Sequence, residues 1–311
     1  MYNNSPTVSV ICLCHNQAKY VQAAIDSIVT QTYRPLELIV VDDGSCDDSV
    51  QKIQQKLQHI PSDIVLKTVF IDKNIGNCKA FNRGLALATG EFVIDHAADD
   101  LLLPMRIAEQ VAAFCQAPPE VGVVFSDVWL ADENGTPRRT FYRRNRAGKL
   151  LEKVPSGNLY IDLLHRYCVC APTMMMRRSV LLELGGYDET LSYEDYDFWV
   201  RSARRWQYWF VDSVSTVKRE LPRSHGKKIY QRGFSLYRNT TLQVCRKAAA
   251  LNCNTAENEA LARMIRYQMR LCLRTGDWTN LRGFYELLQQ INLLGMWDKL
   301  VALPILFTRL C

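Results

Sequence analysis

The chain has 311 residues, of which 48% are hydrophobic and 23% are charged. These fractions are close to the average of globular proteins and exclude a disordered, collagen-like or coiled-coil chain. The formal net charge of +6 is too small to indicate a nucleic-acid-binding protein, so we expect no nucleic acid as partner. The 11 cysteines include no CxxC pair and therefore predict free thiols in a reducing compartment.

Neither end of the chain has the pattern of a membrane or export segment. The opening MYNNSPTVSVICLCHN lacks a basic stretch followed by an apolar core, so we expect no secretory signal. The late apolar run Leu300–Phe307 contains Pro304 and is far shorter than the roughly 20 residues of a membrane span. We expect a cytoplasmic protein, with peripheral contact at the inner face of the membrane as a further option.

Apolar runs alternate with helical patterns through the first third of the chain. Strands are expected at 8–11, 36–41, 64–71 and 92–94, and helices at 21–29, 47–57, 78–88 and 104–114. Continuous apolar strands separated by helices are typical of a parallel sheet covered on both faces. The predicted fold is an α/β domain with a doubly wound, mostly parallel sheet.

The pattern changes in the later parts of the chain. A strand is expected at 121–129, a basic loop at 138–153, a helix from about Asp195 and a strand at 208–217. Met174–Met176 fits core packing and is assigned no chemistry. Helical patterns continue from Phe234, so we expect an α/β domain over 1–233 and a helical C-terminal extension over 234–311.

Polar clusters lie shortly after three of the predicted strands. These clusters are His15-Asn16, Asp42-Asp43 and Asp99-Asp100. Ligands of doubly wound sheets bind beyond the carboxyl ends of the strands, so we expect the clusters to share one crevice. The sequence has neither a GxGxxG after the first strand nor a GxxxxGK[ST]. Carboxylates rather than glycine amides therefore dominate the predicted site.

Asp99 and Asp100 suit a hard divalent cation, Mg²⁺ or Mn²⁺, held together with a substrate diphosphate. An ordinary strand-end turn is the alternative interpretation. Asp42 and Asp43 offer acceptor oxygens for ribose hydroxyls or a base N–H, and again a turn, with Asp47 capping the next helix, is the alternative.

Two later residues are candidates for chemistry. Asp195 begins a predicted helix and is suited to accept a proton from an attacking hydroxyl, although Ser192-Tyr193-Glu194-Asp195 is also a capping-box pattern. His225 follows the last predicted strand and is suited to a metal or a phosphate, with a surface histidine as the alternative.

The order of these motifs resembles the inverting GT-A glycosyltransferases of family 2. The resemblance spans about residues 6–230 and rests on motifs that recur in the family's order. They are Val8–Ile11 with His15-Asn16, Leu38–Ser45, Asn74–Gly76, Ala80–Gly84, Gly90-Glu91, Ala98–Asp100 with Pro104, Gly185–Glu189, Glu194–Asp197 and Arg223–His225. The residues beyond about 230 gain nothing from this likeness.

The resemblance implies transfer of a sugar from a nucleoside-diphosphate donor, with a UDP-sugar favoured, to an acceptor hydroxyl in polysaccharide or glycan synthesis. It implies Asp195 as catalytic base with Glu194 beside it, and Asp99 and His225 as ligands of Mn²⁺ or Mg²⁺. It places the donor sugar near Asp100, Gly185 and Gly186. The implied nucleotide-binding residues are Leu13, Cys14, His15, Asn16, Asp42, Asp43, Lys73, Asn82, Ala98 and Asp99.

The sequence departs from the family's usual pattern at three places. Ala97 stands where an aspartate usually opens the acidic motif, Leu13–Asn16 replaces a proline-threonine-tyrosine-asparagine sequence, and Phe81 replaces a frequent arginine. Two alternatives stay open, a non-catalytic nucleotide-sugar-binding protein and a sugar-1-phosphate nucleotidyltransferase. The basic segment 138–153 and an arginine stripe at Arg263–Arg274 suggest a lipid-linked or other anionic acceptor, or contact with an anionic membrane.

Overall fold

The computed structural model describes residues 5–221 and 225–303, which form two compact units. The first unit contains the residues up to 158 together with 169–190 and 205–221, and the second contains 159–168, 191–204 and the chain from 222 onward. This division differs from the single boundary expected at 233/234. The reason is that α5 (Tyr160–His165) and α7 (Asp195–Ser202) pack with the late helices α9 (Leu236–Leu251) and α10 (Thr255–Thr275).

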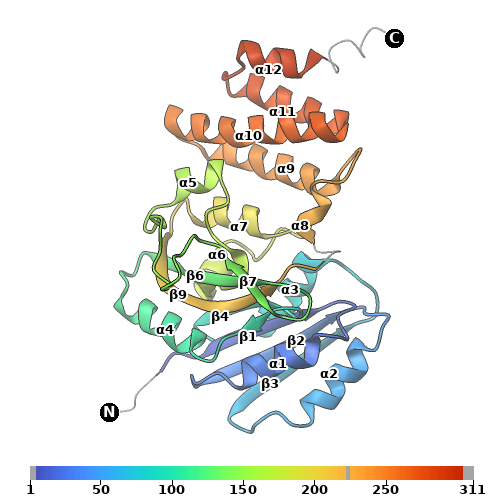
Figure 1. The fold of residues 1–311 in the computed structure, drawn as a ribbon, viewed down its shortest axis with the longest axis vertical. Helices are drawn as coiled ribbons and strands as arrows, with labels where there is room; N and C mark the ends of the chain where they lie inside the picture. The colour runs from blue at the N-terminus through green and yellow to red at the C-terminus, as the bar shows by residue number, and fades with distance from the viewer. Residues whose placement is uncertain (1–4, 222–224, 304–311) are drawn as a thin grey trace. The chain divides into compact units, whose positions relative to one another are not determined.

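The first unit is built around a sheet whose first four strands are parallel (Figure 1). They pair in the order β3-β2-β1-β4, and their bounds are β1 (Val8–Cys14), β2 (Leu36–Asp43), β3 (Ile64–Ile71) and β4 (Phe92–Ala97). All residues of β1 and β2 are buried, as expected for strands inside a parallel sheet covered on both faces.

Helices cover both faces of these strands because alternate side chains point to opposite sides. Val8, Val10 and Cys12 face the core that includes α1 (Val21–Val29), α2 (Ser49–Leu57) and α4 (Arg106–Gln116). The opposite face packs against α3 (Asn77–Leu87), where a Cβ on Gly84 would lie 2.6 Å from Ile11. The doubly wound arrangement predicted from the sequence is therefore confirmed.

The sheet continues beyond β4 as a mixed sheet. The further pairings are β4 with β8, β8 with β6, β9 with β5 and β6 with β7, all antiparallel, and β6 with β9, which is parallel. Their bounds are β5 (Leu101–Leu102), β6 (Val121–Ala131), β7 (Pro137–Thr140), β8 (Met175–Arg177) and β9 (Gln207–Arg219). The predicted strands at 121–129 and 208–217 are confirmed, and Met174–Met176 is buried as expected.

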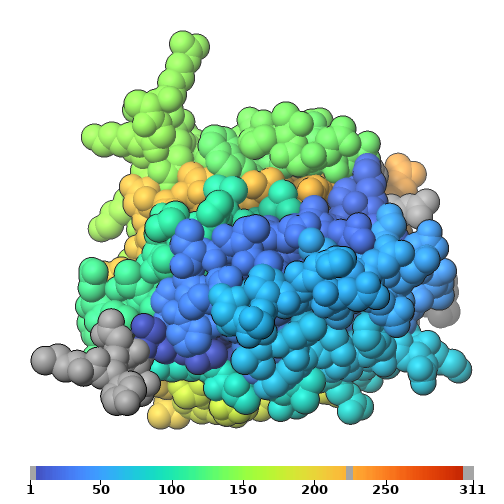
Figure 2. All heavy atoms as spheres, turned by 90° about the horizontal axis from the view of Figure 1, so that it is seen from below, coloured from blue at the N-terminus to red at the C-terminus, as the bar shows by residue number. Residues whose placement is uncertain are grey.

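A basic arm, residues 143–153, follows β7. Its base is anchored by Arg144, whose guanidinium pairs with buried Asp127 at 2.6 Å and with Asp212 at 2.7 Å. Arg144 and Leu150 form an antiparallel bridge across the arm. In Figure 2 the green to yellow-green part of the chain, which includes this arm, projects away from the blue N-terminal part of the same unit.

The second unit is helical, and the helix boundary predicted at Gly276 and Asp277 is found there. Besides α5, α7, α9 and α10 it contains α8 (His225–Lys228), α11 (Trp278–Gln290) and α12 (Met296–Val301). Helix α10 ends at Gly276 in the left-handed conformation, with φ 71°. The Asp277 side chain then caps α11 by accepting a hydrogen bond from the Asn280 amide, and it pairs with buried Arg238 at 2.8 Å.

Two further expectations from the sequence, free cysteine thiols and no membrane-spanning helix, can be compared with the described residues. The cysteines within them are free thiols. Among the described helices, none has the length and apolar character that crossing a membrane requires. Much of the predicted apolar run Leu300–Phe307 lies outside the described residues.

Candidate functional site

The three polar clusters lie at one edge of the first unit's sheet. Cys14 at the end of β1 pairs with Asp42 of β2, and Leu13 pairs with Ala97 at the end of β4. The three parallel strands therefore end at the same level, and the segments that follow them start from a common edge. The expected convergence of these segments is a direct consequence of strand register.

The loop after β1 is bound to the turn after β2. The His15 Nδ1 atom lies 2.8 Å from the Asp43 carbonyl oxygen, and the Asn16 amide donates to the Ser45 hydroxyl at 2.9 Å. The Asn16 side-chain oxygen accepts a hydrogen bond from the Cys46 amide at 2.8 Å. Asn16 has a positive φ of 54°, a conformation that asparagine tolerates better than most residues. Leu13–Asn16 is thus held in a defined shape.

Asp42 and Asp43 bind nearby turns, as the alternative interpretation expects. Asp42 accepts hydrogen bonds from the Ser45 amide and hydroxyl, at 2.9 and 2.6 Å. Asp43 accepts hydrogen bonds from the amides of Ile75 and Gly76, at 2.8 and 3.0 Å. Each ionised carboxylate has about four acceptor positions, so these contacts leave capacity for a ligand.

Lys73 lies beside the same turn because Gly44 permits a close approach of two backbones. A Cβ on Gly44, whose φ is +67°, would lie 2.4 Å from the Asn74 nitrogen and 2.8 Å from the Lys73 Cα. The predicted helix cap is partly corrected here. Helix α2 begins at Ser49 with Asp48 at its N-cap, and Asp47 accepts hydrogen bonds from the amides of Ser49 and Ala18.

The acidic pair after β4 consists of a half-buried carboxylate, Asp99, and a buried one, Asp100. Asp100 is 3% exposed, and its Oδ1 accepts a hydrogen bond from the Arg219 amide at 3.0 Å. Burial raises the pKa of Asp99 above its ordinary value. Burial, and then the neighbouring Asp99 charge, raises the pKa of Asp100 to about 7. The preceding Ala98 is buried, and its amide donates to the Leu13 carbonyl at 2.8 Å.

The donor set fits a divalent cation that is shared with a substrate. The pKa values of Asp99 and Asp100 are both raised, with burial as the largest cause, so a positive ion beside them would offset their charge. Within residues 5–221 and 225–303 no group of three or more His, Cys, Asp or Glu side chains forms a metal cage. Mg²⁺ is commonly held by one or two carboxylates together with substrate phosphates and waters, which matches this arrangement.

His225 begins the short helix α8 of the second unit. Its side chain lies outside the described part of the structure, as do Arg223 and Ser224. Its predicted role as a metal ligand therefore stays a prediction.

Two buried residues near the acidic pair were not predicted. His96, at the end of β4, is 1% exposed, and neither ring nitrogen reaches hydrogen-bond geometry with a described residue, although the Asp100 backbone lies close. Burial, followed by the Arg106 charge, lowers the pKa of His96 to about 3. Arg106 is fully buried, and its guanidinium donates to Thr216 Oγ1, the Met174 carbonyl and Gln110. The hydrophobic periodicity of the sequence does not indicate that His96 and Arg106 are buried, because both are polar residue types that usually lie at the surface.

Asn82 and Gly186 form a structural contact within the first unit. The Asn82 amide donates to the Tyr187 carbonyl at 2.9 Å, and its oxygen accepts from the Tyr187 amide at 2.9 Å. A Cβ on Gly186 would lie 2.4 Å from the same Asn82 oxygen, and both Gly185 and Gly186 have positive φ. Phe81 stacks on Tyr187 with ring centroids 4.1 Å apart. These residues hold one loop against α3, and their predicted donor contacts stay predictions.

Glu194 and Asp195 belong to the second unit. Helix α7 begins at Asp195 as predicted, with Glu194 at the N-cap making no side-chain capping bond. Asp195 Oδ1 accepts a hydrogen bond from the adjacent Tyr196 amide at 2.7 Å, so it satisfies one free amide of the first turn. The nearby Asp197 is buried and paired with Arg201 and Lys247, both at 2.7 Å, which gives it a structural role.

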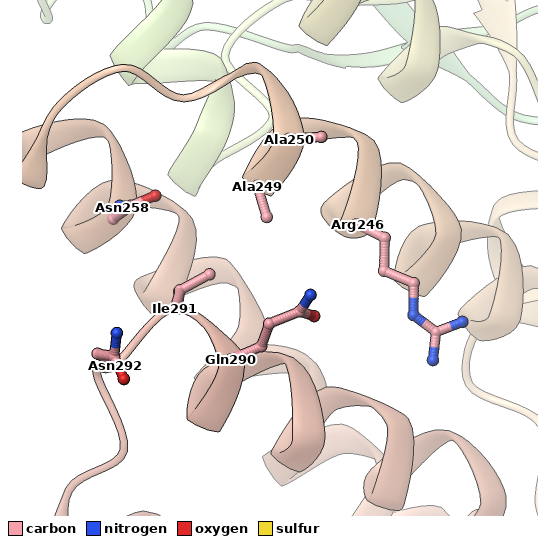
Figure 3. A pocket seen from close by; sticks show the side chains of 7 residues that line it. All are labelled: Arg246, Ala249, Ala250, Asn258, Gln290, Ile291 and Asn292. Carbon is pink, nitrogen blue, oxygen red and sulfur yellow. The ribbon is translucent and has the colours of Figure 1, made fainter.

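The second unit also contains a cavity of about 470 Å³ between α9, α10 and the end of α11 (Figure 3). It is lined by Arg246, Ala249, Ala250, Asn258, Gln290, Ile291 and Asn292. None of the predicted site residues is among them, and the cavity has no cluster of carboxylates. It is therefore not the site that the strand-end motifs predict.

Comparison of the sequence with known proteins shows the family of the chain. Residues 9–185 match the family model described as glycosyl transferase family 2. The putative glycosyltransferase EpsE of Bacillus subtilis is 31% identical over 202 residues, which are 64% of this chain and 67% of EpsE. The O-antigen biosynthesis glycosyltransferase WbnJ of Escherichia coli is 28% identical over 197 residues, or 62% of this chain and 70% of WbnJ. This chain spans 65% of the length of an uncharacterized glycosyltransferase of Methanocaldococcus jannaschii, to which it is 26% identical over 199 residues, or 64% of this chain.

Solved structures share the fold. TarS of S. aureus in complex with UDP-GlcNAc superposes with a TM-score of 0.66 at 17% identity, over 92% of this chain and 80% of that chain. The mannosyltransferase PcManGT of Pyrobaculum calidifontis, in complex with GDP-Man and Mn²⁺, gives a TM-score of 0.61 at 18% identity, over 99% and 82% of the two chains. The fold expected from the sequence is thereby confirmed. Because the family model covers more than half of the residues, the chain belongs to glycosyl transferase family 2.

Proposed function

We propose that this protein is an inverting glycosyltransferase that moves a sugar from a nucleoside-diphosphate donor to an acceptor hydroxyl in polysaccharide synthesis. The observation that carries the proposal is the Asp99–Asp100 pair beyond the carboxyl end of β4, with Asp99 half-buried and Asp100 buried, in a chain of this family. UDP-GlcNAc and GDP-Man in the complexes of similar fold, and the O-antigen assignment of WbnJ, support the substrate class. A cytoplasmic location is part of this proposal.

The donor nucleotide is proposed to bind at the ends of β1, β2 and β4. The segment Leu13–Asn16, which ends β1 and begins the following loop, is proposed to form one wall. Asp42 and Asp43 end β2 and Lys73 follows β3, while Ala98 and Asn82 complete the predicted set. Asp99, with His225 as second ligand, would hold Mn²⁺ or Mg²⁺. A bound divalent cation supplies Lewis-acid stabilisation of the charge that develops on the departing diphosphate.

The transfer is proposed to be one displacement at the anomeric carbon. The acceptor oxygen forms a bond to that carbon, the bond to the diphosphate oxygen breaks, and the nucleoside diphosphate leaves with the bonding electrons. Asp195, with Glu194 beside it, takes the proton of the acceptor hydroxyl. Asp100, Gly185 and Gly186 are proposed to lie near the donor sugar. Attack opposite to the leaving group inverts the configuration.

The acceptor is proposed to be a glycan or lipid-linked molecule, with peripheral contact to an anionic membrane through the basic arm. Four exposed cations of the arm form no ion pair with a described carboxylate, namely Arg143, Arg146, Lys149 and Lys153. Each cation near an anionic membrane contributes about 1 kcal/mol at low salt. Replacing the four by Gln should abolish salt-sensitive binding to vesicles containing phosphatidylserine. Binding that persists at 1 M salt would contradict this electrostatic contact.

The experiment that tests the function is a donor panel. UDP-, GDP- and dTDP-sugars are incubated with Mn²⁺, Mg²⁺ or chelator, and nucleotide release is measured for the wild type and Asp99→Ala. We expect metal-dependent release from one donor that is lost in Asp99→Ala. Absence of both release and nucleotide binding would contradict the proposal.

Two further assays, sugar transfer to added acceptors and incubation with sugar-1-phosphates and nucleoside triphosphates, separate the two alternatives. A non-catalytic binding protein would bind a donor without transferring sugar to any acceptor tested. A nucleotidyltransferase would form a nucleotide-sugar from a sugar-1-phosphate and a nucleoside triphosphate. In the proposed enzyme, Asp195→Asn should lower transfer by about a hundredfold to ten-thousandfold while donor binding is retained.

A further inference from the structure

Arg219 connects three parts of the first unit that end at the same edge of the sheet. It is the last residue of β9 and is 7% exposed. Its Nη1 donates a hydrogen bond to the Asp99 carbonyl oxygen at 2.5 Å, and its amide donates to Asp100 Oδ1 at 3.0 Å. The guanidinium carbon lies 5.0 Å from the centre of the Tyr20 ring, which directly precedes α1. One residue therefore contacts both acids and the end of the loop after β1.

The charge of Arg219 acts on both Asp99 and Asp100, but its guanidinium is only partly compensated for a buried cation. No carboxylate of the described residues forms an ion pair with it, and its Nε is buried without a hydrogen-bond partner among those residues. Arg144 and Arg238, by contrast, pair directly with buried Asp127 and Asp277. A buried, unsatisfied N–H of a charged group costs free energy, so the arrangement calls for an explanation beyond packing.

We propose that Arg219 is a positioning residue that fixes the Asp99–Asp100 peptide for binding of the metal and the donor diphosphate. This inference rests on the proposed function. The hydrogen bond to the Asp99 carbonyl sets the plane of the peptide between the two acids, and the amide bond to Asp100 holds that carboxylate. The Asp99 carboxylate is then presented at the sheet edge in one orientation. Stacking on Tyr20 couples this orientation to the loop proposed to bind the nucleotide.

A role in positioning and a role in charge compensation predict opposite changes in divalent-cation affinity when Arg219 is removed. If Arg219 served to neutralise the acids, its removal would strengthen binding of a divalent cation, because one competing positive charge would be lost. If Arg219 positions the acidic pair, its removal weakens cation binding despite the more favourable charge. The sign of the change therefore distinguishes the two roles.

The test measures Mn²⁺ affinity and nucleotide affinity for the wild type, Arg219→Met and Arg219→Lys. Electron paramagnetic resonance of free Mn²⁺ gives the first, and calorimetry of the nucleoside diphosphate of the preferred donor, with Mn²⁺ and with chelator, gives the second. We expect Arg219→Met to weaken Mn²⁺ binding in the nucleotide complex at least tenfold, with little change in nucleotide binding in chelator. Arg219→Lys keeps the charge and should restore part of the affinity.

Arg177 provides a matched control in the same unit. Its guanidinium also stacks on rings, at 5.4 Å from Phe92 and 5.0 Å from Phe114, and it donates to the Val121 carbonyl at 2.9 Å. Its contacts within the described residues do not include Asp99 or Asp100. Arg177→Met should lower thermal stability and leave Mn²⁺ affinity unchanged.

The outcomes separate this inference from the function on which it rests. If the wild type binds neither Mn²⁺ nor any nucleotide, the proposed function fails. If the wild type binds both, and Arg219→Met binds Mn²⁺ equally well or more tightly, the positioning role is overturned. If Arg219→Met does not fold, Tyr20→Leu removes the stacking partner instead and should weaken Mn²⁺-dependent nucleotide binding severalfold. Unchanged binding in Tyr20→Leu would then overturn the inference.

Discussion

Glu37 and the Asp99–Asp100 pair, all carboxylates of the first unit, are satisfied by the protein in different ways. Glu37 on β2 is 1% exposed and accepts hydrogen bonds from Ser9 Oγ at 2.5 Å and the Thr89 amide at 2.9 Å, and it pairs with Lys67. Burial by itself would raise the pKa of Glu37, but these partners outweigh it and the pKa lies below its ordinary value. At the end of β4, burial outweighs the partners of Asp99 and Asp100, and both pKa values are raised.

This difference separates a carboxylate that serves the fold from a pair suited to a ligand. The charge of Glu37 is satisfied by the protein, so its loss should cost stability. The charge of the acidic pair is incompletely satisfied, so a bound cation should stabilise it and its loss should cost activity. The predictions below test this contrast, from the largest expected effect to the smallest.

Asp99→Ala should have the largest effect, and it should fall on activity. We expect metal-dependent donor turnover to fall roughly a thousandfold, because several kcal/mol of transition-state stabilisation depend on the metal. The melting temperature should be unchanged or higher, since one of two neighbouring like charges with raised pKa values is removed. Steady-state kinetics and thermal unfolding of the same preparation check both parts. A lower melting temperature with unchanged turnover would reverse the assignment.

Glu37→Gln should show the opposite pattern. We expect a loss of about 2 kcal/mol in unfolding free energy, because a neutral amide cannot accept all the hydrogen bonds that Ser9, Lys67 and Thr89 donate to the buried Glu37 carboxylate. Turnover per folded molecule should stay unchanged. Asp63→Asn is the control, since Asp63 forms an ion pair with Arg34 but its side chain is 57% exposed. Its loss should cost less than about 1 kcal/mol in urea unfolding.

His96 should make stability depend on pH. Its pKa is lowered from 6.5 to about 3 by burial, so between these values the unfolded chain binds a proton that the folded chain does not. Stability from His96 is therefore complete above pH 6.5 and is lost as the pH falls toward 3. His96→Leu should gain about 2 kcal/mol relative to the wild type between pH 7.5 and pH 5.

The comparison with His96→Leu is needed because Asp100 acts in the opposite direction. Its raised pKa means that the folded chain binds a proton first, so acidification toward pH 4 favours the folded state. This contribution is present in both proteins and largely cancels in their difference. Equal pH profiles for the wild type and His96→Leu would show that His96 is not held neutral by burial.

The sequence predicts the regular elements well where hydrophobic periodicity is strong. The strand at 64–71 and the helix at 21–29 have the predicted bounds, and Gly276 and Asp277 end and begin helices as expected. Strands β5, β7 and β8 were not predicted, since two to four residues carry no periodic signal. The short helices α5 and α6 (Arg178–Glu183) were missed for the same reason.

The strand-end acids were predictable because Asp42-Asp43 and Asp99-Asp100 come shortly after apolar runs of a predicted parallel sheet. Partners from distant parts of the sequence were not. Arg219 contacts residues 119 and 120 positions away, and no spacing rule connects them. His96 was overlooked because the expected strand stopped at residue 94, while β4 continues to Ala97. The structural contacts of Asn82 also depend on a loop more than a hundred residues away.

The most direct test of the central claim is calorimetry of nucleoside diphosphates with the wild type and Asp99→Ala, in Mn²⁺ and in chelator. If the acidic pair is the metal and donor site, the wild type should bind one nucleotide at least tenfold more tightly in Mn²⁺ than in chelator. Asp99→Ala should lose that difference and keep the weaker, metal-independent binding. Equal affinities in Mn²⁺ and chelator for the wild type, or a metal effect that survives in Asp99→Ala, would contradict the claim.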